Sequence, residues 1–86
     1  MAYSITYKNS VQRDLKKLSK VEAARILNQI EGELSKKPET YPVLKGQFAG
    51  LRKYRVGDYR VIFAILGNEV LILRIGHRRN VYRRKI

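Results

Sequence analysis

Alternating apolar and polar residues predict a β-strand at the start of the chain. Tyr3, Ile5 and Tyr7 are separated by Ser4 and Thr6, which gives the two-residue period of a strand with one buried face. Such a strand buries its three large side chains and exposes the two small hydroxyl side chains. The chain is therefore expected to begin with β-structure.

The apolar spacing then changes to that of an α-helix. Val11, Leu15 and Leu18 recur at intervals of four and three residues, and Asn9 or Ser10 is placed to cap the first turn. A first, short helix is therefore predicted over this segment.

A second helix is predicted directly after the first. Ser19 and Glu22 have the spacing of a reciprocal capping box, and Pro38 closes the segment. The apolar stripe of this helix consists of Ala23, Leu27, Ile30 and Leu34. Because so few residues connect the two helices, they are expected to fold back on each other as an antiparallel helical hairpin.

Three more strands are predicted in the second half of the chain. Residues 38–50 contain both prolines and two glycines, which favours a loop. Beyond it, β-branched and aromatic runs are separated by Gly57-Asp58 and Gly67-Asn68, and such two-residue gaps are typical of β-hairpins. The predicted fold class is α+β: an N-terminal strand, an antiparallel helical hairpin that covers one face of a sheet, and a three-stranded antiparallel meander.

Length and composition limit the class of protein. The 86 residues, 44% of them hydrophobic, are expected to form one domain, 1–86, around a single core. The absence of Cys removes disulfides, thiolate zinc sites and cysteine nucleophiles. The N-terminus has no apolar signal segment and the longest apolar run, 61–66, is too short to span a membrane. A cytoplasmic protein that makes no membrane contact is therefore expected.

The charge balance indicates a polyanionic partner. Nineteen Lys and Arg residues against seven Asp and Glu give a net charge of +12. Residues 40–86 hold eleven of these bases and only two acids, Asp58 and Glu69. High positive charge keeps a small protein soluble, but repulsion on this scale also destabilises the free fold. Nucleic acid is therefore the favoured partner.

The first predicted hairpin gathers three cations on one surface. With a two-residue turn, Arg55 lies directly opposite Arg60, and Lys53 is on the same face, which points away from the helices. Like charges opposed across a sheet are destabilising by about 0.2–1 kcal/mol. Each of these long side chains can splay into water. As a set they predict a phosphate site, because paired guanidinium groups suit phosphate recognition.

The last strand delivers further candidates to the same end of the sheet. The second two-residue turn places Tyr59 opposite Gly76 and puts His77 on the face of the three cations. Arg78 and Tyr82 reach this face only if a strand end or a bulge redirects the chain. The basic C-terminal tail, 77–86, is either a solvated end or a contact for RNA phosphates.

The residue inventory leaves phosphodiester chemistry or binding alone. One His, no Cys and scattered acids argue against a metal site, and no phosphate-binding glycine loop or serine elbow is present, so no cofactor is expected. RNA needs no metal for cleavage, because its 2′-hydroxyl can attack the adjacent phosphate while cations stabilise the developing charge. The candidates for proton transfer are Lys53, His77 and Tyr82, because a cationic cluster lowers the pKa of Lys and Tyr.

Two stretches of sequence resemble the RelE/ParE toxin superfamily of type II toxin–antitoxin modules. They are GLRKYRVGDYRVIF at 50–63 and IGHRRNVYR at 75–83, and the similarity extends over nearly the whole chain, including Leu44-Lys45-Gly46. The closer likeness is to RelE, an mRNA interferase that cuts messages in the ribosomal A site and leaves a 2′,3′-cyclic phosphate. The resemblance implies the microbial ribonuclease-like RelE fold and a metal-free endoribonuclease that acts on the ribosome.

The resemblance also implies roles for individual residues. The catalytic set is Lys53, Arg55, Arg60, Arg78 and Tyr82. In this set Arg60 stabilises the transition state, and Tyr82 stacks on a base or assists proton transfer. Arg55 stands where the best-studied RelE pattern has a lysine, which shifts the general-base role to Lys53 or Tyr82. The implied RNA-binding residues are Lys45, Arg52, His77, Arg79, Arg83 and Arg84.

The implied partners are an acidic RelB-like antitoxin, mRNA and the ribosome with its rRNA. The toxin alone is expected to be monomeric and to form a higher-order complex with the antitoxin. The alternative is a ParE-like toxin, which keeps the fold, lacks the nuclease residues and inhibits DNA gyrase.

Overall fold

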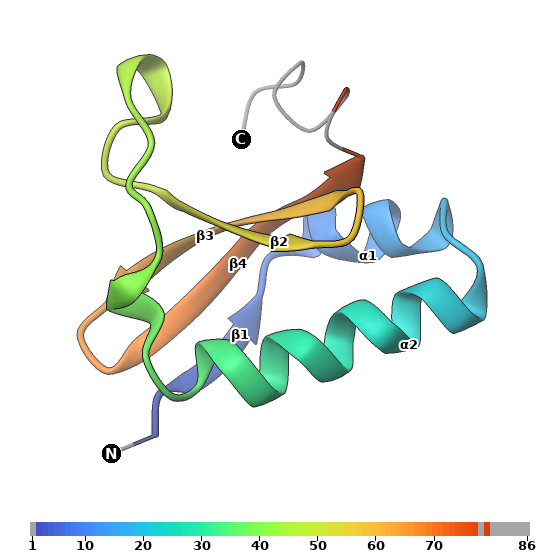
Figure 1. Ribbon diagram of the computed structural model, residues 1–86, viewed down its shortest axis with the longest axis horizontal. Helices are drawn as coiled ribbons and strands as arrows, with labels where there is room; N and C mark the ends of the chain where they lie inside the picture. Colours follow the sequence, from blue (N-terminus) through green and yellow to red (C-terminus); the bar gives the residue numbers. More distant parts are fainter. Residues whose placement is uncertain (1, 78, 80–86) are drawn as a thin grey trace.

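A four-stranded sheet with two helices on one of its faces forms the protein (Figure 1). The computed structural model describes residues 2–77 and residue 79. Its elements are β1 (Ser4–Tyr7), α1 (Asn9–Lys16), α2 (Lys20–Gln29), β2 (Arg52–Val56), β3 (Tyr59–Leu66) and β4 (Glu69–His77). The predicted α+β fold class is confirmed.

The strands lie in the order β1-β4-β3-β2. The predicted meander is present, because β2 pairs antiparallel with β3 and β3 with β4. Gly57 and Gly67 have φ values of 60° and 63° at the first positions of the two turns, which a glycine adopts without strain. Strand β1 runs parallel to β4 at the edge of the sheet, a position that the local pattern did not predict.

The first helix does not have the predicted cap. Lys8 occupies the N-cap position of α1 and makes no side-chain capping bond. The prediction that Asn9 or Ser10 caps this helix is wrong, because the helix already begins at Asn9. The hydroxyl of Ser10 instead donates to the carbonyl of Leu73 in β4 at 2.8 Å. A residue expected to serve its own helix therefore attaches that helix to the sheet.

The second helix has half of the predicted capping box. The hydroxyl of Ser19 accepts a hydrogen bond from the amide of Glu22 at 3.1 Å. The carboxylate of Glu22 does not reach back to Ser19, because it pairs with Arg25 at 3.1 Å. One amide of the first turn is thus satisfied by the cap, and the carboxylate still lies in the acid-favouring first turn of the helix.

The buried side of α2 differs from the predicted stripe. Ile26, Ile30 and Leu34 are fully buried, whereas Ala23 and Leu27 are partly exposed. The helix continues as a π-helical turn over Ile30–Leu34. Side chains four residues apart share one side of a helix, and the buried stripe keeps this spacing from Ile26 in α2 through the π-helical turn to Leu34.

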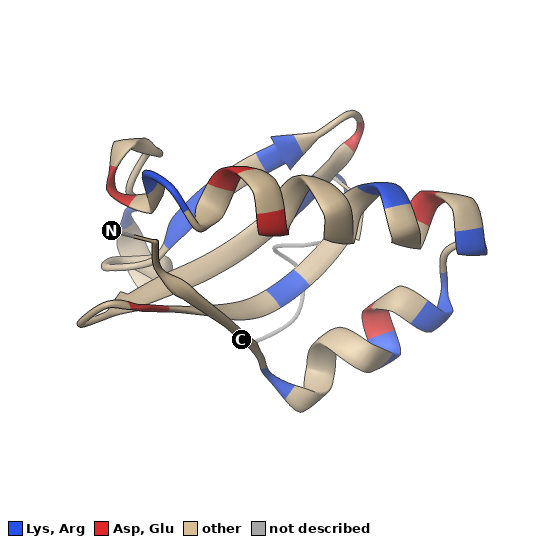
Figure 2. Ribbon diagram, turned by 90° about the horizontal axis from the view of Figure 1, so that it is seen from below, with Lys and Arg blue, Asp and Glu red and all other residues tan. Residues whose placement is uncertain are grey.

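The core lies between the helices and the sheet. It is formed by Val11, Ile26, Ile30, Leu34, Tyr54, Val56, Val61, Phe63, Val70, Ile72 and Ile75. Figure 2 shows that α1 and α2 meet at their connection and splay apart from it, so each helix covers a different part of the sheet. In the described part of the chain, no helix is long and apolar enough to cross a membrane.

A β-bulge interrupts the pairing of β3 with β4. Ile62 pairs with Arg74, but Phe63 pairs with Ile72, so Leu73 is the extra residue. The bulge lets Ile72 and Ile75 face the same core although they are three residues apart. A regular strand would bury Arg74 in place of Ile75, and burying a charged side chain in the core costs free energy.

The bulge corrects the predicted register at the end of the sheet. Tyr59 lies opposite His77, and Arg60 lies opposite Gly76. The prediction of Tyr59 opposite Gly76 is therefore wrong, because it assumed continuous pairing from the turn. The predicted pairing of β2 with β3 is confirmed, with Arg55 opposite Arg60.

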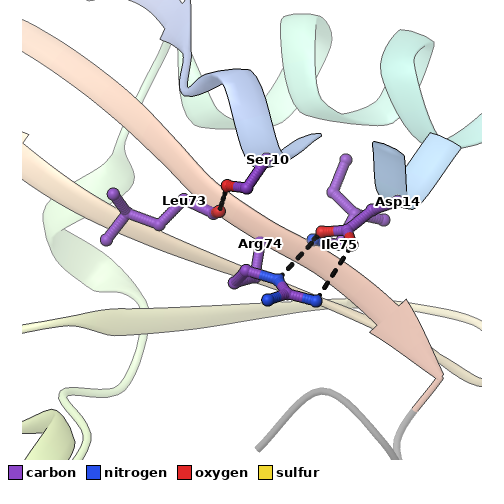
Figure 3. A network of polar contacts seen from close by, with 5 residues as sticks. All are labelled: Ser10, Asp14, Leu73, Arg74 and Ile75. Carbon is purple, nitrogen blue, oxygen red and sulfur yellow. Dashed lines mark hydrogen bonds and ion pairs between the residues drawn. The ribbon is translucent and has the colours of Figure 1, made fainter. Parts of the chain in front are cut away.

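Helix α1 covers the part of β4 that β1 does not reach. Pairing with β1 ends at Ile72, whose carbonyl accepts from the amide of Lys8 at 2.9 Å. Farther along β4, the Ser10 hydroxyl binds the bulge carbonyl, and the carboxylate of Asp14 accepts from the amide of Ile75 at 2.9 Å (Figure 3). Side chains of a helix thus satisfy the edge of β4 in place of a neighbouring strand.

Candidate nucleic-acid interface

Three cationic side chains lie together on the face of the sheet opposite the helices. Arg55 in β2 is directly opposite Arg60 in β3, and Lys53 lies two residues before Arg55 on the same side. Arg55 is exposed, and Lys53 and Arg60 are partly exposed. We call these three residues the basic face. Its predicted composition is confirmed by the register of the β2–β3 hairpin.

No carboxylate in the described part of the chain neutralises the basic face. The two ion pairs among the described residues join Arg25 to Glu22 and Arg74 to Asp14, and neither involves the basic face. Asp58, in the turn next to Arg60, is exposed and forms no ion pair among the described residues. Like charges on adjacent strands repel by about 0.2–1 kcal/mol per pair, and a bound anion would convert this repulsion into attraction.

Aromatic packing on the helix side holds the hairpin that carries the basic face. The ring of Tyr54 meets that of Tyr41 edge-on with centroids 5.0 Å apart, and Tyr41 meets Phe63 at 6.4 Å. The hydroxyl of Tyr54 donates to Gln29 of α2 at 3.1 Å. Burial raises the pKa of Tyr54, with smaller contributions from Tyr41 and Glu33.

Arg52 lies on the opposite face from the three cations. It pairs with the buried Phe63, and its guanidinium donates to the carbonyls of Glu39 and Tyr41 at 3.1 and 2.8 Å. These bonds hold the loop that precedes β2 against the sheet. The structure therefore gives Arg52 a structural role, and its predicted RNA binding stays a prediction.

His77 does not join the basic face. It lies opposite Tyr59 on the helix side, with the ring centroids 5.8 Å apart, and its Nδ1 accepts from the amide of Arg79 at 3.3 Å. The predicted position of His77 beside the cations is wrong, because the bulge shifts β4 by one residue. The β4 residue directly opposite Arg60 is Gly76, which has no side chain.

Of the remaining predicted residues, two are exposed and four lie outside the described part of the chain. Lys45 is exposed just before a short helical turn, Gly46–Phe48, in the loop. Arg79 is exposed beyond the end of β4. Arg78, Tyr82, Arg83 and Arg84 lie outside the described residues. Their predicted roles are therefore carried forward as predictions.

Sequence reasoning missed two residues that shape the site, Asp14 and Leu73. A signal for the bulge at Leu73 was present, because Arg74 follows Val70 and Ile72 in phase and would be buried in a regular strand. A buried acid on a short helix has no comparable local signal. Asp14 is identified only by its partners on β4.

Acidic groups gather with tyrosines at the other side of the molecule. The hydroxyl of Tyr7 donates to Glu31 at 2.5 Å, and Figure 2 shows acidic residues along the α2 side. Burial, followed by the hydrogen bond to Glu31, raises the pKa of Tyr7 well above its ordinary value. In the described part of the chain, no cluster of three or more His, Asp or Glu residues could hold a metal ion.

Comparison with known proteins identifies the family. Residues 5–82 match the family model described as the ParE toxin of the type II toxin–antitoxin system parDE. The chain is also 33% identical to Toxin RelG from Mycobacterium tuberculosis over 98% of its own length and 100% of that protein's. The chain therefore belongs to the RelE/ParE superfamily of type II toxin–antitoxin toxins, as its sequence resemblance implied.

Solved structures agree with this assignment. The toxin–antitoxin complex RelBE2 from Mycobacterium tuberculosis contains a chain with a TM-score of 0.83 and 31% identity, covering 91% of this chain and 100% of that one. The intact RelBE complex from E. coli matches with a TM-score of 0.71 over 88% of this chain and 96% of that one. Its 17% identity makes it evidence for the fold alone. The relatives carry both RelE-type and ParE-type names, so the family by itself leaves the activity open.

Proposed function

We propose that this toxin cleaves mRNA on the ribosome by attack of the 2′-hydroxyl on the neighbouring phosphate. The observation that carries the proposal is the basic face, where Lys53, Arg55 and Arg60 share one surface and no described carboxylate neutralises them. A phosphodiester placed against these groups meets cations on two adjacent strands. Fixed cations of this kind stabilise the negative charge that develops on the phosphate during the reaction.

Each cation has a distinct place in the proposed reaction. Arg60 is on β3, an inner strand of the sheet, and is less exposed than Arg55, so we assign it the transition-state role. Arg55 supplies positive charge, because a guanidinium is a poor proton acceptor. Lys53 is the described basic-face residue that can exchange a proton, and Tyr82 is the second candidate for this step.

The position directly opposite Arg60 on β4 carries no side chain. Gly76 is opposite Arg60, and the next β4 residue on this face is Arg74, which pairs with Ile62. His77, which was a third candidate for proton transfer, is turned to the helix side and packs on Tyr59. Proton transfer in the proposed mechanism therefore rests with Lys53 and Tyr82.

A cognate antitoxin is the second proposed partner. Related chains occur in toxin–antitoxin complexes, including RelBE2 from Mycobacterium tuberculosis. The net charge of +12 favours a largely acidic antitoxin, because opposite charges speed the encounter and oppose wrong partners. We propose that the antitoxin covers the basic face and so prevents RNA binding.

The test is cleavage of a defined message on purified ribosomes that hold one codon in the A site. The wild-type protein should cut within that codon, and Arg60→Ala should lower the rate constant by about a hundredfold to a thousandfold. Lys36→Ala is the control, since Lys36 is an exposed cation outside the β2–β3 hairpin. Intact message with the wild-type protein would refute the proposal.

The alternative proposal is inhibition of DNA gyrase, which the match to the ParE toxin model favours. Gyrase and supercoiled plasmid are incubated with the same protein preparations. Trapped, cleaved DNA together with untouched mRNA would support this alternative. Variants of the basic face should then trap DNA as well as the wild type does, because gyrase inhibition needs no phosphodiester chemistry by the toxin.

A further inference from the structure

A second positively charged surface lies at the connection between α1 and α2. It consists of Arg13, Lys16, Lys17 and Lys20, and we call it the connector surface. All four residues are exposed. In Figure 2 the connection projects from the body of the molecule and carries basic residues on both helices.

No acid balances this surface within the described residues. Asp14 is the one acid of α1, but it is 5% exposed and is held by Arg74 and the amide of Ile75. The next acid along the chain, Glu22, pairs with Arg25. The sole nearby carboxylates are therefore committed elsewhere, and the connector surface keeps its full charge.

Local helix stability explains only part of this arrangement. Arg13 and Lys16 are in the last turn of α1, where the helix dipole favours cations. Lys20 is the first residue of α2, where the dipole disfavours a cation. Like charges three and four residues apart on a helix also repel, by about 0.2–0.5 kcal/mol for each pair. The helix dipole therefore accounts for Arg13 and Lys16 but not for Lys20, and a bound anion would offset the repulsion within the whole set.

The connector surface and the basic face are on different sides of the protein. Lys53, Arg55 and Arg60 are on the sheet face that the helices do not cover, whereas the connector surface belongs to the helices themselves (Figure 1). The sheet face can receive a flexible single strand. A projecting corner fits the outside of a stiff polyanion, which presents its phosphates without bending.

We propose that the connector surface binds the phosphate backbone of double-helical RNA, while the basic face binds single-stranded RNA. The toxin then grips two RNA segments at once, with a folded RNA on its helix side and a strand on its sheet side. This proposal goes beyond cleavage and does not depend on it, because it concerns binding of an RNA that is not cut.

The test measures binding of the purified toxin to a blunt RNA duplex of about two helical turns and to a single strand of equal length. The connector variant is K16Q/K17Q/K20Q. A matched control, K8Q/K36Q/K37Q, removes the same charge from three other exposed lysines. The third variant, K53Q/R55Q/R60Q, removes the charge of the basic face.

The connector variant should bind the duplex at least about tenfold more weakly, and its slope of log K against log salt should fall by about 2–3. Its affinity for the single strand should change little. The basic-face variant should show the reverse preference, and the control should match the wild type. Circular dichroism checks the fold of each variant, and K16R/K17R/K20R should retain duplex binding.

Equal loss of duplex binding in the connector variant and the control would overturn the proposal, since net charge alone would then explain the effect. Unchanged duplex binding in the connector variant would overturn it too. The proposal would also be overturned if the connector variant bound an acidic protein or anionic vesicles more weakly than the wild type does but bound RNA equally well. The ribosome assay decides the proposed cleavage separately, because it depends on Arg60 and not on the connector surface.

Discussion

Asp14 and Arg74 form a two-pronged ion pair between α1 and the bulged end of β4. Nε and Nη2 of Arg74 donate to Oδ2 and Oδ1 of Asp14, each at 3.0 Å, and the side chains are only 12% and 4% exposed. Asp14 also accepts from the amide of Ile75 (Figure 3). One carboxylate therefore fixes the helix, the bulge and the register that places Gly76 beside Arg60.

Asp14→Ala should lower the free energy of unfolding by about 3 kcal/mol or more, because Arg74 is left with a buried, unpaired charge. Removing both partners in D14A/R74M should be less destabilising than D14A alone. Urea denaturation followed by circular dichroism measures both. Glu22→Ala is the control, since it breaks an exposed pair worth at most about 1 kcal/mol. Equal losses for Asp14→Ala and Glu22→Ala would contradict the assigned role.

Arg55→Gln should stabilise the folded protein while weakening RNA cleavage. The variant removes a like charge directly opposite Arg60, so the free energy of unfolding should rise by about 0.2–1 kcal/mol at low salt. The gain should shrink in high salt, where the repulsion is screened. Lys36→Gln, an exposed lysine away from the hairpin, serves as control. A destabilised Arg55→Gln would show that the side chain supports the fold.

Arg52→Gln should destabilise the protein without a large effect on catalysis. Its guanidinium holds two carbonyls of the loop, so the loss should be about 1–3 kcal/mol. The rate constant for cleavage by the remaining folded protein should stay within a few-fold of the wild type. A rate defect as large as that of Arg60→Ala, with unchanged stability, would restore the RNA-binding role predicted from the sequence.

Alkaline pH should destabilise the protein in a way that depends on Tyr7. Its pKa is raised in the folded state, mainly by burial and then by Glu31, above the ordinary value of about 10. The stabilisation is therefore complete below about pH 10 and is lost as the pH rises through the folded-state pKa.

Glu31→Gln tests this pH dependence, because it removes the charge next to Tyr7 and leaves its burial intact. Phenolate absorbance should then appear at lower pH than in the wild type, and the loss of stability above about pH 10 should be smaller, because the folded-state pKa of Tyr7 lies closer to its ordinary value. Glu22→Gln, which alters an acid of the first turn of α2, should leave the phenolate titration unchanged. Identical titration curves for all three proteins would exclude a contribution from Glu31.

The two ends of the β2–β3–β4 meander show why part of the fold could be predicted. The β2–β3 register follows from a two-residue turn alone, because side chains alternate strictly between faces on either side of it. Lys53, Arg55 and Arg60 could therefore be grouped from their spacing. The β3–β4 register could not be extended in the same way, because Leu73 interrupts the alternation and its place depends on α1.

The chain's local pattern determined its elements, their order, both tight turns and the three cations of the basic face, since these depend on neighbours within a few residues. Tertiary contacts alone decided that β1 lies beside β4 and that Asp14 is buried. These features involve residues about sixty positions apart, such as Asp14 and Arg74. The stabilising partner exists only after the chain has folded, so no local spacing can reveal it.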